Sequence, residues 1–155
     1  MFIVKASTGE RVEIDIDLVE GRDYKNLTAT KYFFKWKYES AYEVYKLRIK
    51  GQEDILGVVS MEKVVHEERI EIRLLATSRE NMGKEKIYDG IAGNLIAYAC
   101  RLALKEFGAG TAVTLFPKTE LIPHYVNCYG MIPAGRHLML LGDNLFEILK
   151  KYDHD

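Results

Sequence analysis

The sequence predicts a mixed α/β (α+β) fold, in which helices flank a central and mostly antiparallel sheet. Three observations lead to this fold class. Residues 41–78 have the pattern of three consecutive strands with short turns, which is typical of an antiparallel meander. Residues 91–107 carry the apolar period of one long amphipathic helix. Strand and helix patterns then alternate up to the C-terminus, which favours a mixed α/β domain.

The first third of the chain opens with one clear strand. In residues 11–19, Val12, Ile14 and Ile16 alternate with acidic residues, as in a strand that has one solvated face. We expect this to be the first strand. Residues 23–40 are rich in aromatic side chains and have no clean period, which indicates short helical turns.

The middle of the chain provides the meander and the long helix. Strands are expected over 41–50, 55–65 and 70–78, because apolar and β-branched residues there are separated by turns. The helix begins near Ile91 and ends at Gly108, since glycine commonly follows the last helical residue.

The last third continues with shorter elements. Residues 111–116 form a β-rich run that predicts a buried strand, and Pro117 ends it. A helix follows over 119–129, for which Thr119 is a plausible N-cap. A strand over 136–141 and a terminal helix over 144–152 complete the prediction.

Length and composition set the class of protein. The 155 residues are enough for one domain, and without repeats or linkers we expect residues 1–155 to form a single domain. Lys and Arg number 22 and Asp and Glu 23, a net charge of -1, so neither nucleic acid nor a membrane is an expected partner. The N-terminus lacks the pattern of a signal peptide, and we expect a cytoplasmic protein. Cys100 and Cys128 belong to no CxxC pair, so neither a disulfide framework nor a metal site is expected.

Small residues lie at the start of the long helix. Gly90, Ala92 and Gly93 come where a loop enters it. Unpaired amides and the positive end of the helix dipole bind phosphate well, and small side chains let an anion approach them. The alternative is that these residues serve only close packing against a neighbouring strand.

From about Val44 to Leu141 the chain resembles the GNAT acetyltransferase superfamily. The runs that carry the resemblance are "IYDGIAGNLIAYACRLAL" and "LIPHYVNCYGMIPAG", after an antiparallel meander. Gly90 and Ala92 match the small positions of the loop pattern [QR]-x-x-G-x-[GA], whereas Ile87 stands where that pattern has Gln or Arg. Arg79, Lys84 or Lys86 could contact the phosphate in place of that Gln or Arg.

The resemblance implies that the cofactor is acetyl-CoA or another acyl-CoA. Its pyrophosphate would lie on the amides of Ile91, Ala92, Gly93 and Asn94. Its pantetheine arm would add like a strand to the edge of residues 70–78, with hydrogen bonds around Leu75, Ala76 and Thr77. This edge exists only if that strand and residues 111–116 splay apart.

The resemblance also implies a tyrosine that protonates the departing thiolate of CoA. The usual tyrosine lies four residues before the glycine, a position that Val126 occupies here, so Tyr125 and Tyr129 compete, with Tyr125 placed first. Asn127 is a further candidate cofactor contact. For each tyrosine, a half-buried structural role is the alternative.

Two carboxylates are candidates for the general base. Glu71 lies on the strand face opposite Ile70 and Ile72, and Glu62 lies on the preceding strand, so either could draw a proton through water, although both could equally be exposed strand residues. His124 is of interest because histidine is the residue type whose ordinary pKa is nearest neutrality, but it could be an ordinary surface residue. Cys128 has no assured base partner, and it is discounted as a nucleophile.

The leading function is therefore an acyl-CoA-dependent N-acyltransferase that acts on a small amine or on a protein amino group. The alternatives are a catalytically silent CoA-binding or protein-interaction domain, and a plain α/β domain without a CoA site. The aromatic residues within 32–42 could line an acceptor pocket or simply cover the core. A homodimer through a sheet edge or the terminal helix is left open.

Overall fold

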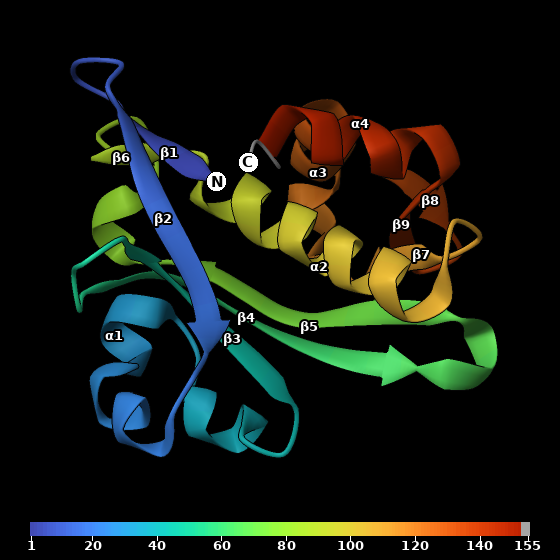
Figure 1. Ribbon diagram of the computed structural model, residues 1–155, viewed down its shortest axis with the longest axis horizontal. Coiled ribbons are helices and arrows are strands. Elements are labelled where there is room, and N and C mark those ends of the chain that lie inside the picture. Colours follow the sequence, from blue (N-terminus) through green and yellow to red (C-terminus); the bar gives the residue numbers. More distant parts are fainter. Residues whose placement is uncertain (153–155) are drawn as a thin grey trace.

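The computed structural model describes residues 1–152, and among these nine strands form one sheet in the order β6-β1-β2-β3-β4-β5-β7-β9-β8 (Figure 1). Neighbouring strands are antiparallel except β5 and β7, which are parallel. The strands are β1 (Phe2–Lys5), β2 (Arg11–Leu18), β3 (Glu43–Ile49), β4 (Ile55–Val64), β5 (Arg69–Thr77), β6 (Tyr88–Asp89), β7 (Ala112–Leu115), β8 (Ile132–Ala134) and β9 (His137–Leu141). The helices are α1 (Ala29–Tyr32), α2 (Ile91–Phe107), α3 (Ile122–Tyr129) and α4 (Gly142–Tyr152). The predicted mixed, mostly antiparallel sheet with flanking helices is confirmed.

Three short strands were not predicted. β1 precedes β2, so the prediction that residues 11–19 form the first strand was wrong. β1 pairs with both β2 and β6, and β6 leads directly into α2. β8 contains Pro133 and lies at the edge of the sheet, where proline is tolerated. These strands have four, two and three residues, too few to show a period of two.

The helix α3 begins later than predicted. Thr119–Leu121 form a separate 3-10 turn, and Leu121 rather than Thr119 takes the N-cap position. Pro123 lies in the first turn of α3, where its missing N–H costs nothing. Gly130 ends the helix in the left-handed conformation.

The segment before the meander covers one face of the sheet. It consists of three short turns, Gly21–Asn26, α1 and Trp36–Glu39, as the missing period indicated. Trp36 is completely buried there and donates its ring N–H to the carbonyl of Tyr32 at 3.0 Å. Trp36 and Tyr32 thus belong to the core.

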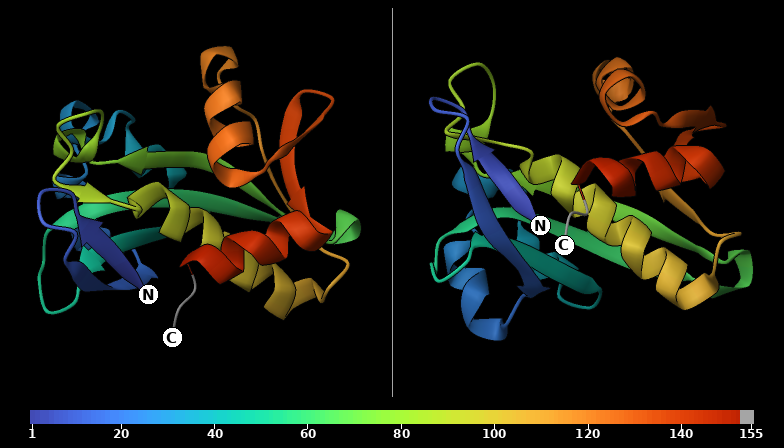
Figure 2. Two further views of the ribbon diagram at one scale, coloured as in Figure 1. Left: turned by 90° about the horizontal axis from the view of Figure 1, so that it is seen from above. Right: turned by 45° about the horizontal axis from the view of Figure 1, so that its top comes forward.

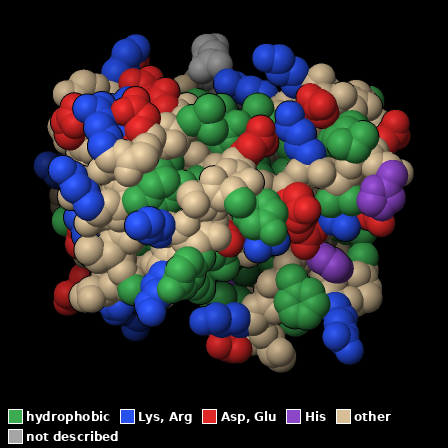
Figure 3. Space-filling view, turned by 90° about the horizontal axis from the view of Figure 1, so that it is seen from below, with side chains coloured by type: hydrophobic (Ala, Val, Ile, Leu, Met, Phe, Trp, Pro, Cys, Tyr) green, Lys and Arg blue, Asp and Glu red, His purple; other side chains and the backbone are tan. Residues whose placement is uncertain are grey.

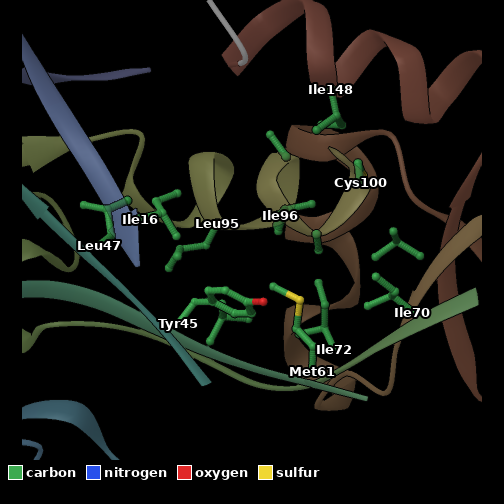
Figure 4. Packing of buried hydrophobic residues seen from close by; sticks show 14 of the residues in the cluster. Ile16, Tyr45, Leu47, Met61, Ile70, Ile72, Leu95, Ile96, Cys100 and Ile148 are labelled. Atoms are coloured by element: carbon green, nitrogen blue, oxygen red, sulfur yellow. The ribbon is translucent and has the colours of Figure 1, made fainter. Parts of the chain in front are cut away.

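The helix α2 packs on the opposite face. Its side chains Leu95, Ile96 and Cys100 meet Met61 and Ile72 of the sheet in the main core (Figure 4). Burial raises the pKa of the Cys100 thiol to about 12, so this cysteine is structural. The helix α4 lies alongside α2 (Figure 2).

The strands β5 and β7 part at one end. Their parallel pairing runs from Arg69 and Ala112 to Ile72 and Leu115 and stops there. β5 continues to Thr77 while it pairs only with β4, and a bulge at Arg73 bends it where the two strands separate. The splay that a free main-chain edge requires is therefore present along Leu75, Ala76 and Thr77.

Candidate active site

The N-terminus of α2 offers free amides. Gly90 is its N-cap and has φ of 94°, a left-handed conformation that glycine adopts without strain. The first amides of a helix have no partner within the helix. The amide of Asn94, however, donates to the carbonyl of Gly90 at 3.0 Å. Of the four amides expected to bind phosphate, this leaves Ile91, Ala92 and Gly93.

Gly93 has a packing role that the sequence did not indicate. The ring of Tyr152 at the end of α4 covers it, and a Cβ on Gly93 would lie 2.2 Å from Tyr152 Cζ. The small residues thus have different functions, because Gly93 admits the tyrosine ring whereas Gly90 and Ala92 face a cavity. The packing alternative holds for Gly93, but the partner is a helix residue rather than a strand.

We expect the change Gly93→Ala to lower the free energy of unfolding by about 1 kcal/mol. Overpacking destabilises by about 1–3 kcal/mol, and the higher helix propensity of alanine compared with glycine offsets up to about 1 kcal/mol of this. In a Tyr152→Ala background the clash is gone, so the same change should stabilise the protein. Urea unfolding of the four proteins measures this reversal of sign, and equal effects in both backgrounds would contradict the packing.

A cavity of about 420 Å³ joins the start of α2 to the free end of β5. It brings together three parts of the chain that are distant in sequence, within residues 77–92, 124–129 and 151–152. Its lining residues include Thr77, Asn81, Lys86, Gly90, Ala92, His124, Cys128, Tyr129, Lys151 and Tyr152.

Two lysines stand at this cavity. Lys86 is one of the three cations suggested for the missing phosphate contact, and it lines the cavity. It also pairs with Asp89 at 3.0 Å. Arg79 instead donates to the carbonyl of Thr30 at 2.8 Å and lies over the ring of Phe33. Lys151 also lines the cavity. Sequence reasoning missed Lys151, since nothing local shows that α4 ends beside the start of α2.

The two tyrosines on α3 occupy different places. Tyr129 lines the cavity, whereas Tyr125 packs against the main core and is not among the lining residues. Burial raises the pKa of both hydroxyls, and for Tyr129 the nearby Tyr152 adds to the effect. Both phenols therefore stay protonated at neutral pH and could donate a proton. Asn127 is exposed on α3 and is likewise absent from the lining.

A thiol and an imidazole face the cavity together. Cys128 Sγ lies 3.4 Å from His124 Nδ1, one turn earlier on α3, and both line the cavity. From the sequence alone Cys128 had no assured base partner, and in the structure the imidazole of His124 lies beside its thiol. His124 also contacts the ring of Tyr129 edge-on.

Glu71 lies in a polar network on the face of the sheet away from α2. Its carboxylate accepts hydrogen bonds from Arg69 Nη1 at 2.5 Å and from the hydroxyl of Thr114, and it lies 3.0 Å from His137 Nε2. Glu62 is directly opposite on β4 and is more exposed. Sequence reasoning found Glu71 but not His137, which comes from another strand.

Among residues 1–152, no three His, Cys, Asp or Glu side chains lie close enough together to hold a metal ion. Within the same residues, no helix has both the length and the apolar character needed to cross a bilayer.

Comparison with known proteins identifies the fold. No protein-family model matches the sequence, and no curated protein is detectably similar to it. Solved structures do match. A chimera of the Vibrio cholerae spermidine N-acetyltransferase SpeG with hSSAT has a TM-score of 0.64 and 14% identity, covering 88% of this chain and 98% of that chain. AtaTR bound with acetyl-CoA has a TM-score of 0.61 and 16% identity, with the same coverage. A Bacillus subtilis acetyltransferase in complex with CoA has a TM-score of 0.54 and 18% identity, covering 84% and 99%.

Proposed function

We propose that this chain, which has the fold of the GNAT acetyltransferases, moves an acetyl group from acetyl-CoA, or another acyl-CoA, to a primary amine. The observation that carries the proposal is the junction of two free main-chain surfaces. The unpaired edge of β5 ends at Thr77, and Thr77 shares a cavity with Gly90 and Ala92 at the start of α2. Structures of this fold that contain acetyl-CoA or CoA support the choice of cofactor.

The residues at this junction suit an acyl-CoA. The amides of Ile91 and Ala92, which line the cavity, would hold the diphosphate, and Lys86 and Lys151 add positive charge there. The edge of β5 would take hydrogen bonds from the amide groups of the pantetheine arm. Thr77 to Ile72 is five residue steps, or about 16 Å, which leads from the phosphate site to the point where β5 and β7 part.

The reaction needs two proton transfers. The bound cofactor supplies the thioester, and an amine can attack it only when the nitrogen is neutral. Tyr125 and Tyr129 are both candidates for protonating the thiolate, because burial keeps each phenol protonated at neutral pH. Tyr129 lines the cavity at the phosphate end, which does not by itself place it at the thioester. Glu71 and its polar network are the candidates for accepting the proton of the amine.

The acceptor that we propose is a small-molecule amine or a protein amino group in the cytoplasm. One neighbour in fold is named for spermidine, a small polyamine, which supports an amine acceptor. The near balance of charge does not favour a nucleic acid or a membrane as partner.

Two measurements test this function. Coenzyme A at 100 times its dissociation constant should stabilise the protein by about 2.7 kcal/mol, seen as a rise in Tm. Free thiol should then appear from acetyl-CoA when a panel of amines is supplied. If Tm does not rise, the chain is a plain α/β domain without a CoA site. A rise without thiol release by any amine would identify a silent CoA-binding domain.

A further inference from the structure

His137 lies beside the point where β5 and β7 separate. It opens β9, and the next residue, Leu138, pairs with Leu115 of β7. Leu115 is also the last residue of β7 that pairs with β5, through Ile72. Glu71 precedes Ile72, so the pair of His137 and Glu71 stands next to the apex of the splay.

This pair lies on the face of the sheet opposite α2. Ile70 and Ile72 face α2 in the main core, so Glu71 between them faces the other side. Figure 3 views that side, where histidine side chains lie at one end and acidic and basic side chains are spread over the face. Phe116, at the end of β7, is 61% exposed there, and the His137 side chain is 38% exposed. An acceptor in solution can therefore reach the apex from this face, while the cofactor cavity opens at the start of α2.

The imidazole of His137 is held in one orientation. Its Nε2 points to Glu71 Oε1 at 3.0 Å, and its ring meets that of Phe116 edge-on with centroids 5.6 Å apart. Glu71 is held in turn by Arg69 and Thr114. When Nε2 carries the proton shared with Glu71, Nδ1 is the nitrogen left to accept another.

Histidine is better suited than Glu71 to take a proton from an amine. Three donors already approach the carboxylate of Glu71, so its oxygens are engaged in hydrogen bonds and an ion pair. A base works best when its pKa lies near the working pH, as that of an ordinary histidine does. Glu71 faces the ring from β5, and Arg69 pairs with the other oxygen of the same carboxylate. Glu67, in the turn before β5, pairs with Arg69 and interacts electrostatically with the imidazole.

We infer that His137 is the general base for the acceptor amine and that Glu71 is its positioning residue. The inference rests on the proposed acetyl transfer and goes further by naming the proton acceptor. An N–H bond of the ammonium breaks, and the proton moves to Nδ1. The nitrogen lone pair then forms the C–N bond to the acetyl carbon as the C–S bond breaks. The departing thiolate takes the proton of the tyrosine hydroxyl, and the new amide nitrogen gives its surplus proton back to the tyrosinate through water. The imidazolium returns its own proton to water.

The test compares two acceptors in His137→Gln. For an alkylamine that is protonated at pH 7, kcat/KM should fall by roughly a hundredfold or more. For a hydrazine or arylamine, which is already neutral, the loss should be smaller than about tenfold. His66→Gln, at an exposed position in the turn before β5, is the matched control and should keep full activity with both acceptors. An unchanged Kd for CoA shows that each variant is folded.

Glu71→Gln tests the positioning role. The acid limb of the pH profile of kcat/KM should move to lower pH, because the carboxylate no longer stabilises the imidazolium. The midpoint of the NMR titration of the His137 ring should move in the same direction, and it can be measured in the absence of substrates. A ring that titrates identically in both proteins, or equal losses with both acceptors in His137→Gln, would overturn the inference. Failure of the wild type to acetylate any amine would refute the proposed function and the base together, whereas full activity in His137→Gln would refute the base alone.

Discussion

The change Gly90→Val should raise the Kd for CoA by about a hundredfold or more. Gly90 has φ of 94°, which a β-branched residue avoids at a cost of about 1–2 kcal/mol. We expect the chain to relieve this strain by rotating the peptide that carries the amide of Ile91, which would also move the neighbouring amide of Ala92. Each hydrogen bond to a charged phosphate contributes about 1.5–3 kcal/mol, so the loss of two exceeds a factor of one hundred. Isothermal titration with CoA measures the change.

The turn between β3 and β4 offers a matched control. Gly51 also has a positive φ, 82°, and a Cβ there would meet nothing within 4 Å. Gly51→Val should therefore cost a similar amount of stability while the Kd for CoA stays the same. An affinity that survives Gly90→Val, or that falls equally in both variants, would show that the amides of α2 do not hold the cofactor.

The parts of the fold that the sequence predicted are those with a strong local period. The meander and α2 each bury one face over many residues, so their apolar positions repeat at the spacing of a strand or a helix. β1 and β6 are short and exist because they pair with one another beside the start of α2. Such pairing joins residues that are distant in the chain, and no local pattern records it.

In the candidate site, too, the features that depend on a local pattern were predicted and most of those that depend on tertiary contacts were not. Gly90 was predicted because the loop and the helix that hold it are contiguous in the sequence. The ring of Tyr152 over Gly93, the thiol of Cys128 beside His124 and the pairing of His137 with Glu71 were missed or misjudged. Two of these contacts join different elements, so only the tertiary fold brings them together. The spacing of four residues between His124 and Cys128 did offer a local signal, since such residues are neighbours on a helix.

A buried ion pair on the other side of the sheet should dominate the stability of the segment before the meander. Lys46 Nζ of β3 lies 2.7 Å from Asp23 Oδ2, and the two side chains are only 8% and 14% exposed. Asp23→Asn should lower the free energy of unfolding by about 3–5 kcal/mol, because the ammonium is left buried without its carboxylate. Urea unfolding at pH 7 measures this loss, and a loss below about 1 kcal/mol would contradict it.

The same pair predicts how stability depends on pH. Burial raises the pKa of Asp23, but the hydrogen bond from Lys46, the amide of Glu20 and nearby positive charge outweigh this, and the pKa lies below its ordinary 3.8. A lowered folded-state pKa gives stability that is present above the unfolded value and lost as pH falls through the folded value. The difference in the free energy of unfolding between wild type and Asp23→Asn should therefore become smaller below about pH 3.8. A difference that stays constant down to about pH 2 would rule this out.

Replacing both partners distinguishes the contribution of the ion pair to stability from the cost of leaving one charge buried without its partner. Lys46→Met should cost less than Asp23→Asn, because Asp23 keeps the amide of Glu20 at 2.8 Å and the charge of Arg22. The double variant Asp23→Asn with Lys46→Met should recover most of the lost stability, since no charge remains buried and the methionine fills the space of the lysine stem. If the double variant were as unstable as Asp23→Asn alone, the ammonium would not be the cause of the loss, and the asparagine itself would have disturbed the turn at Gly21–Asn26.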